Sequence, residues 1–451
     1  MPKRHIVLSE AVAKADHIVR ATLRNRVGTT IGGVVGTAVS GVVCGVFLPK
    51  RLTDPIKLRF QPTPAQATRL NLALLAARLP EMSFNATTRF GNRRIVFSAD
   101  KVWCSSISTG HRYGIPFVSD FTGEPTDFHM THFGIGAPAR RRGAFSLTPN
   151  RVINTGMIII PSYTGNVRVR RAPRPRFSLR NGVRLVFTKH FSYEKDDRDE
   201  AISFSELAAE FRLTGKTQNI SDVSKDLDDF LLLSSFAARH RCVSLGWTYT
   251  DSRGNIVHHY RRDIAIPKEK DISSRDTLID ITEFPKFIRA AYRRFCGFTE
   301  KDQFGRAIYP LISDADKTTE MSYFSLFSGL ESALLFADRT FHIFPRGHRP
   351  LHERWTVFHA KYSVDISDLW PVTDKTNGIT LVQLRNKVAH GEYLNPGQTL
   401  ALLYAREHLR WAVERVVLSL LGWPVAKSRV RAGSLGHLYP YNNWKQARAT
   451  F

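Results

Sequence analysis

The stretch LVQLRNKVAHG, residues 381–391, decides how the C-terminal part of the chain is expected to fold. Leu381, Leu384 and Val388 recur at the spacing of one helix face, so we expect them to point into a core. The arginine and asparagine between them then lie on another surface. A glycine directly after the histidine is the residue preferred in the left-handed turn that follows a helix. The stretch therefore predicts a short helix over residues 379–389 with a polar, outward face.

The residue types on that face suit chemistry on RNA. Asn386 and His390 are four positions apart, so they share a helix face. Cleaving RNA without a metal needs a proton acceptor for the ribose 2′-OH, a proton donor for the leaving 5′ oxygen, and a cation near the phosphate. A histidine can transfer protons near neutral pH, and an arginine can hold two phosphate oxygens. Arg385, Asn386 and His390 are therefore candidate catalytic residues. The alternative is that Arg385 and His390 only cap the helix and pair with neighbouring carboxylates.

The spacing of arginine and histidine proves little by itself, since Arg253 with His258 and Arg354 with His359 have the same separation. The candidate helix is distinguished by its whole pattern: an apolar stripe, Arg-Asn, three residues, His-Gly, and a long amphipathic helix after a brief polar loop. This pattern resembles the HEPN superfamily, and most closely the ApeA-like HEPN proteins of bacterial anti-phage defence, whose helical bundles carry an Arg-Asn-x-x-x-His motif. The resemblance covers the C-terminal part only, with a weaker echo at residues 227–236.

The resemblance implies a homodimer in which the motif helices of two subunits meet, so that two arginines and two histidines line one cleft. It implies a metal-independent endoribonuclease without a cofactor that acts on tRNA or other host or phage RNA and leaves a 2′,3′-cyclic phosphate. Its role would be abortive infection or toxin-like, with an unknown phage trigger. Glu331 lies where related proteins often carry an acidic residue, which makes it a candidate supporting residue. Since some HEPN domains are not catalytic, the alternative is an adaptor that binds nucleic acid or a membrane and uses the bundle for dimerisation.

Further helical patterns accompany the motif helix. Apolar residues recur at helical spacing in the segments 284–295, 323–335, 353–361 and 400–421. Short connections between such segments predict antiparallel neighbours in a bundle. The predicted domains in this part of the chain are a HEPN helical bundle over residues 276–425 and a basic C-terminal tail over residues 426–451.

The preceding part of the chain has a different pattern. Short alternating or β-branched runs separated by turn residues predict strands, with one helix expected at residues 64–79. We therefore expect a mostly β domain over residues 53–195. The predicted fold class is α+β, with a mostly β N-terminal region followed by an all-α C-terminal helical bundle.

Residues 196–275 are interpreted as a mixed connector between these two parts. Helical spacing begins at residues 204–211, and a second helix is expected at residues 224–239. Residues 243–249 and 256–261 alternate around a turn sequence, which predicts a β-hairpin.

The charge of the chain is strongly one-sided. The formal net charge of +25 favours a polyanionic partner such as RNA, DNA or an anionic membrane. No Asp or Glu occurs between Phe128 and Tyr193, whereas arginines accumulate there. The candidate nucleic-acid contacts are Arg140, Arg141, Arg142, Arg168, Arg170, Arg171, Arg174 and Arg176. The alternative is a solvated basic face or an Arg/Pro-rich loop at residues 171–176.

The segment 1–52 raises the question of a membrane. Residues 9–26 have the spacing of a short amphipathic helix. Residues 27–48 carry no charge, contain six glycines and are just long enough to span a bilayer as a helix. Val with Gly equally suits buried strands, so a membrane contact and a soluble sheet both stay open. Four scattered cysteines are too few for a disulfide framework, which favours a cytoplasmic protein, membrane-associated if residues 27–48 insert.

Two weaker patterns involve histidine and glycine. His129 and His132 have a spacing that could bind a metal, but no cysteine or second carboxylate cluster completes a site, so no metal is predicted. His258 and His259 lie in the predicted hairpin and are expected at the surface. Residues 134–139 superficially resemble a phosphate-binding turn, but no strand-then-helix pattern surrounds them, and they are interpreted as a loop.

Overall fold

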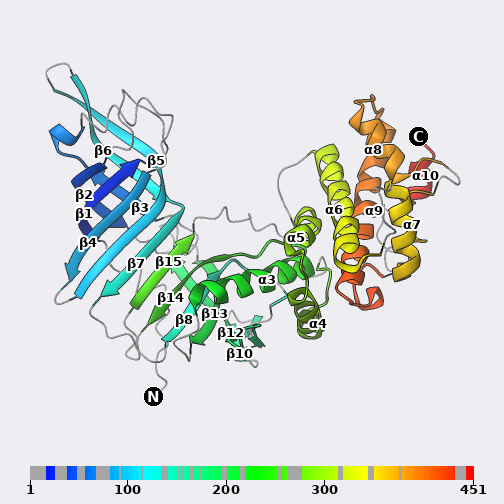
Figure 1. Cartoon of the computed structure of the whole chain (residues 1–451), viewed down its shortest axis with the longest axis horizontal. Helices are drawn as coiled ribbons and strands as arrows, with labels where there is room; N and C mark the ends of the chain where they lie inside the picture. Colours follow the sequence, from blue (N-terminus) through cyan, green and yellow to red (C-terminus); the bar gives the residue numbers. More distant parts are fainter. Residues whose placement is uncertain are drawn as a thin grey trace. The chain divides into compact units, whose positions relative to one another are not determined.

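The computed structural model divides the chain into two compact units (Figure 1). The sheet unit comprises Met1–Pro149, Thr155–Asp226 and Val243–Ile266, and the helical unit comprises Asn150–Asn154, Leu227–Cys242 and Pro267–Phe451. Within them the structure describes residues 17–25, 38–47, 56–67, 82–90, 93–112, 115–133, 141–150, 152–153, 157–161, 167–171, 175–195, 201–213, 219–250, 256–262, 277–312, 318–343, 350–374, 378–431 and 443–451. Strands dominate the N-terminal part and helices the C-terminal part, so the predicted α+β fold class is confirmed.

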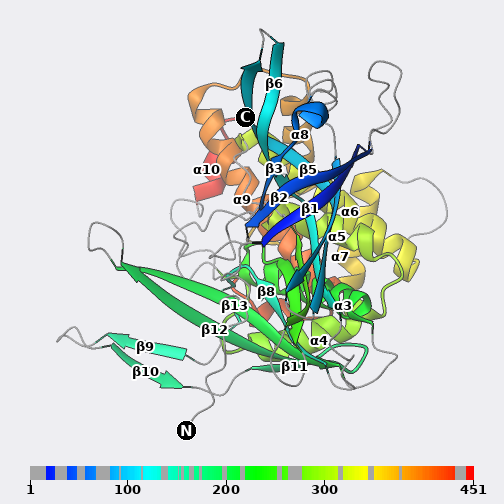
Figure 2. The same cartoon turned by 90° about the vertical axis from the view of Figure 1, so that its left-hand side faces the viewer.

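The sheet unit is built on one thirteen-stranded sheet in the order β11-β12-β13-β8-β14-β15-β7-β5-β4-β1-β2-β3-β6. Its strands are β1 (His17–Asn25), β2 (Ala38–Phe47), β3 (Lys57–Gln61), β4 (Met82–Phe90), β5 (Arg93–Arg112), β6 (Ile115–Pro125), β7 (Asp127–Phe133), β8 (Arg141–Leu147), β11 (Arg176–Ser178), β12 (Arg184–Lys195), β13 (Ala201–Leu213), β14 (Ser244–Thr250) and β15 (Ile256–Arg262). A separate antiparallel pair consists of β9 (Met157–Pro161) and β10 (Val167–Arg171) (Figure 2).

Strands far apart in the sequence are neighbours in this sheet. β8 lies between β13 and β14, and β7 lies between β5 and β15. β6 pairs with both β3 and β5, so the sheet folds back on itself at that end. The middle of the sheet is therefore complete only when the late hairpin β14–β15 is added to strands from the first third of the chain.

The core of the sheet unit follows from the alternation of side chains along each strand. In β3, Leu58 and Phe60 are buried while the three residues around them are exposed. Phe60 stacks on Phe121 with 4.5 Å between ring centroids and meets Phe84 edge-on at 5.8 Å. Such apolar inner faces supply most of the stabilisation of a sheet of this kind.

The helical unit is a bundle around one long helix. Its helices are α4 (Phe284–Cys296), α5 (Lys301–Ile312), α6 (Thr319–Phe341), α7 (Leu351–Tyr362), α8 (Leu381–Ala389), α9 (Pro396–Leu420) and α10 (Trp444–Arg448), with the 3₁₀ turn η2 (Val425–Lys427). Before them comes α3 (Ile220–Ala238), whose residues divide between the two units at Asp226 and Leu227. α9 contacts α5, α6, α8 and α10. All four predicted bundle helices and the motif helix are confirmed, as is the helix at residues 224–239.

Two of the predicted helices are wrong. Residues 17–25, within the expected helix 9–26, form β1, and residues 204–211 lie inside β13. Both segments are short, and a short apolar run fits the helical and the strand period alike, so pairing with neighbouring strands decides. The expected helix at 64–79 begins at residues 64–67, and residues 68–79 lie outside the described residues.

The interpretation of residues 196–275 as a connector also differs from the structure. The hairpin itself is confirmed, since β14 and β15 pair antiparallel with Trp247 opposite Tyr260. However, β13, β14 and β15 are all strands of the large sheet. The sequence predicts a connector because the charged run at residues 196–200 separates these strands from the preceding ones.

The two chain ends differ from the sequence interpretation as well. Ala38–Phe47, within the uncharged segment 27–48, forms β2, and the rest of that segment lies outside the described residues. Among the helices that the structure describes, none combines the length and the apolar character needed to cross a bilayer. The expected C-terminal tail contains α10, in which Trp444 and Arg448 are buried. The four cysteines are free thiols.

Candidate functional site

The motif helix α8 is fixed at its beginning by local and long-range hydrogen bonds. Thr380 and Gln383 form a capping box: the Gln383 N–H donates to Thr380 Oγ1 (3.2 Å), and the Thr380 N–H donates to Gln383 Oε1 (2.9 Å). The buried Tyr323 hydroxyl donates to the carbonyl of Leu381 (2.7 Å). Burial raises the pKa of Tyr323 well above its usual value, so the hydroxyl keeps its proton. Leu381 and Leu384 are buried as predicted.

The Arg385 side chain lies half-exposed on the outer face of α8, as predicted. Its Nη2 is 3.9 Å from Oε1 of Glu331 on α6, and both side chains are 40% exposed. Its Nη1 donates to Oδ1 of the neighbouring Asn386 at 3.3 Å. The guanidinium also lies over the ring of Phe327, 5.6 Å from the centroid. Glu331, Phe327 and Asn386 together orient the guanidinium while leaving part of it accessible.

His390 is exposed at the C-cap of α8. The helix ends in a Schellman turn, in which the Gly391 N–H donates to the Val388 carbonyl at 3.1 Å. The Glu392 N–H donates to the Lys387 carbonyl at 3.2 Å. Gly391 adopts φ +71°, the left-handed conformation that the sequence predicts. Val388, expected in the core, is only half-buried. The turn therefore holds His390 at the surface on the same helix as Arg385.

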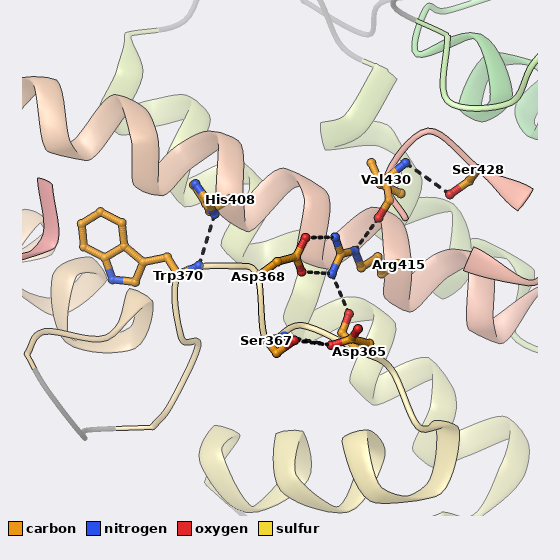
Figure 3. Close-up of polar contacts among 8 residues, drawn as sticks. All are labelled: Asp365, Ser367, Asp368, Trp370, His408, Arg415, Ser428 and Val430. Atoms are coloured by element: carbon orange, nitrogen blue, oxygen red, sulfur yellow. Dashed lines mark hydrogen bonds and ion pairs between the residues drawn. The ribbon is translucent and has the colours of Figure 1, made fainter. Parts of the chain in front are cut away.

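The loop that leads into α8 is fastened to α9 by a buried arginine (Figure 3). Arg415 is fully buried, and its Nη1 and Nη2 donate to the Asp368 carboxylate at 2.6 and 2.9 Å. Its remaining donors reach the carbonyls of Asp365 and Val430, each at 2.6 Å. An arginine that satisfies a carboxylate and two carbonyls fixes three chain segments relative to one another.

Two further contacts hold the same loop. The Trp370 N–H donates to Nδ1 of His408 on α9 at 3.2 Å, as Figure 3 shows. Arg448 of α10 donates to the carbonyls of Ile379 and Gly378, each at 2.7 Å, directly before α8 begins. Sequence reasoning missed these supporting residues. For Arg415 the only signal was a charged residue inside the apolar stripe of α9.

The predicted arginine surface is described only in part. Arg142 on β8 and Arg176 on β11 are exposed, and β12 and β13 lie between their strands. The backbones of Arg141, Arg168, Arg170 and Arg171 lie in strands, whereas their side chains, with Arg140 and Arg174, are outside the described residues. Nucleic-acid contact by these eight arginines therefore stays a prediction.

A second cluster of polar side chains lies on the adjacent strands β7 and β15. Nδ1 of His129 is 3.4 Å from Nε2 of His258, whose Nδ1 is 3.1 Å from Oγ1 of Thr131. The Tyr260 hydroxyl donates to Oδ1 of Asp127 at 2.5 Å. His129 packs against Tyr260 with 4.5 Å between ring centroids. The spacing in the sequence suggests that His129 acts together with His132. In the fold, His129 lies beside His258 instead.

Burial keeps the imidazoles of this region neutral. It lowers the pKa of His129, and it lowers the pKa of His258 to about 4, with the neighbouring His129 adding to the effect. Burial likewise lowers the pKa of His259 to about 3. The Thr248 hydroxyl lies 2.7 Å from Nδ1 of His259. The expectation that His258 and His259 lie at the surface is wrong: His259 is buried and His258 is only partly exposed.

Comparisons of this chain with protein-family models, with curated proteins and with solved structures find no match. The meaning of the site therefore depends on its own residues and geometry.

Proposed function

We propose that the helical unit is a HEPN-type, metal-independent endoribonuclease, with Arg385, Asn386 and His390 as its catalytic residues. One observation carries the proposal: α8 is held by buried contacts at its beginning, yet its Arg-Asn-x-x-x-His side chains all reach the surface. If Arg385, Asn386 and His390 served only to stabilise the helix, they would not need to be accessible to a ligand.

Each residue has a role in this proposal that its position allows. His390, exposed at the helix end, takes the proton from the ribose 2′-OH or returns a proton to the leaving 5′ oxygen. Arg385 stabilises the charge that develops on the phosphate. Asn386 and Glu331 orient the guanidinium through the contacts at 3.3 and 3.9 Å. A phosphate that binds Arg385 would replace Glu331 as its partner. The Arg385–Glu331 contact is weak because both side chains are half-exposed.

The reaction needs two proton transfers, so the proposal includes a homodimer in which a second α8 supplies another histidine and arginine. Large apolar side chains exposed close to the motif support such a partner surface. Tyr393, three residues after His390, is 88% exposed, and Leu400 at the start of α9 is 52% exposed. Abortive infection or a toxin-like role, host or phage RNA as the substrate, and a phage trigger belong to the same proposal.

The test compares matched histidine variants on RNA. Wild-type protein and the His390→Ala and His359→Ala variants are incubated with total RNA in EDTA, and the product ends are analysed. His359 is the control because it follows Arg354 on α7 at the same spacing. We expect cleavage to 2′,3′-cyclic phosphates by wild type and His359→Ala, and loss of at least about a hundredfold in His390→Ala. Undiminished cleavage by His390→Ala would refute the site assignment.

A non-catalytic adaptor is the second candidate, favoured by the contacts that already occupy the Arg385 guanidinium. It predicts salt-sensitive RNA binding without products, equal in wild type and in the Arg385→Ala/His390→Ala variant. The same incubation therefore separates the two functions.

A further inference from the structure

Three arginines line up across the large sheet of the sheet unit. Arg212 on β13 is paired with Arg142 on β8. The register between β12 and β13 pairs Val186 with Glu210, and two residues further along it Arg184 lies opposite Arg212. All three arginines are exposed. Because paired residues of antiparallel strands point to the same face, they form one row across β12, β13 and β8, which we call the arginine row.

Each end of the arginine row has a hydroxyl side chain. Arg184 is paired with Ser178 on β11, and Arg142 is paired with Thr250 on β14. The row with its two hydroxyl residues therefore crosses five neighbouring strands. Neighbouring strands lie about 4.7–4.9 Å apart, so the three arginines span about 10 Å of the sheet.

The opposite face of these strands belongs to the apolar core. Leu185 and Phe211, the sequence neighbours of two of the arginines, are buried. Phe211 packs against Phe145 of β8 with 4.8 Å between ring centroids. A core on one face and polar residues on the other is the usual alternation of a half-buried antiparallel sheet. The arginine row is therefore on the outer face, where a ligand can reach it.

The arginine row is unfavourable for folding by itself. Like charges directly opposite each other on neighbouring strands destabilise a sheet. Within the part of the chain that the structure describes, no carboxylate forms an ion pair with Arg142, Arg184 or Arg212. Glu210 is the one carboxylate on this face of the five strands whose side chain is described, and it is half-buried two residues from Arg212 along β13. A polyanion bound along the row would remove the repulsion.

The surroundings of the arginine row favour a nucleic acid over a membrane. A surface helix that binds a bilayer inserts large apolar side chains between the lipids, and we expect the same of a sheet face. None of the exposed large apolar residues in the described ranges lies on β8 or on β11 to β14. The described side chains of these strands likewise offer no exposed aromatic ring that could stack on a base. Contacts to phosphates and sugars remain, and these carry no sequence information.

We propose that the arginine row binds the phosphate backbone of a single nucleic-acid strand, irrespective of its base sequence. Arginine suits this role because one guanidinium can hold two phosphate oxygens. A single line of guanidinium groups follows a single backbone, and the hydroxyls of Ser178 and Thr250 can donate further hydrogen bonds at its ends. The arginine row lies entirely in the sheet unit, so the proposal does not depend on the ribonuclease activity of the helical unit.

Fluorescence anisotropy of the full chain with an oligothymidylate of about 20 nucleotides tests the arginine row. DNA lacks the 2′-OH that the proposed ribonuclease attacks with, so the probe stays intact whether or not that activity exists. Wild type should bind it, and the affinity should fall as the salt concentration rises. The Arg142→Gln/Arg184→Gln/Arg212→Gln variant should bind at least about tenfold more weakly. Its plot of log affinity against log salt concentration should be less steep by about 2, for three lost phosphate contacts at about 0.7 each.

The matched control removes the same charge elsewhere. Arg20→Gln/Arg289→Gln/Arg293→Gln changes three exposed arginines outside the arginine row and should bind the probe like wild type. If wild type does not bind the probe, or if the two triple variants lose the same affinity, the proposal is overturned. Vesicles of phosphatidylcholine and phosphatidylserine are added to the same proteins. Vesicle binding that depends on the arginine row, without binding of the probe, would assign the row to a lipid surface and reject the nucleic acid.

A single substitution decides the question if the triple variant fails to fold. Arg212→Gln changes only the middle of the arginine row and relieves the repulsion between its neighbours, so it should fold. Its salt dependence should be less steep than that of wild type by about 0.7. An unchanged salt dependence in this variant would also overturn the proposal.

Discussion

Each unit contains a buried ionisable group whose partners are well described, and the two groups differ in charge. The sheet unit buries imidazoles in their neutral form, with the pKa of His258 at about 4 and that of His259 at about 3. The helical unit buries a charge, the guanidinium of Arg415, against Asp368 and two carbonyls. A neutral imidazole can stay buried until the pH falls far enough to protonate it. A buried guanidinium is stable only while all of its hydrogen-bond partners are present. The units should therefore fail under different perturbations.

The largest effect is expected from Arg415→Met. The variant leaves Asp368 and two carbonyls without their donor, so the helical unit should lose about 3–5 kcal/mol of unfolding free energy. Calorimetry should show a lower unfolding temperature for the helical unit and little change for the sheet unit. Lys387→Met, which breaks the surface pair with Glu392, is the control and should cost less than about 1 kcal/mol. Equal losses in the two variants would contradict the contrast between the units.

Acidification should destabilise the sheet unit through its buried imidazoles. His258 has a pKa of about 4 in the folded chain, below its ordinary value of 6.5. As the pH falls below 6.5, the unfolded chain binds a proton at His258 that the folded chain does not bind. The free energy of unfolding therefore decreases between pH 6.5 and about 4. The loss attributable to His258 is at most about 3.4 kcal/mol. The unfolding temperature of the sheet unit should fall with pH in wild type and less steeply in His258→Gln, and parallel pH profiles would contradict this origin.

A matched pair of glycine substitutions gives the smallest expected effects. Gly246 in β14 has φ +135°, and an added Cβ would lie 2.0 Å from the carbonyl oxygen of Tyr260. Gly391 has φ +71°, with no atom within 4 Å of an added Cβ. Gly246→Ala should therefore cost about 2–3 kcal/mol, from strain and a backbone clash, and Gly391→Ala about 1 kcal/mol from strain alone. Denaturant unfolding of each unit measures both, and a larger cost at Gly391 would reverse the order.

The helical unit could be predicted from sequence better than the sheet unit. Helix-forming patterns are local, so the stripe of α9 and the His-Gly end of α8 were visible without knowledge of their neighbours. The strand β1 was not, because its nine residues fit either period and only the pairing with β2 and β4 decides. The same reason explains why residues 204–211 predict a helix although they lie inside β13.

The candidate site shows the same division between local and distant information. Arg385, Asn386 and His390 were found because they lie within six residues of one another. The contacts of Phe327 and Arg448 with the motif region join residues far apart in sequence, which no spacing rule reveals. The meeting of His129 and His258 across 129 positions is of the same kind, and the local pattern suggested His132 instead.

The order of strands in the sheet has a consequence for synthesis on the ribosome. β7 and β8 are translated early, but their missing neighbours β15 and β14 follow about a hundred residues later, which at typical elongation rates is a delay of roughly 5–20 seconds. Throughout that delay the nascent chain carries unpaired strand edges, the kind of surface on which chaperones act and chains aggregate. A fragment that stops before Ser244 would keep those edges open permanently, so shortened versions of this protein should precipitate rather than fold.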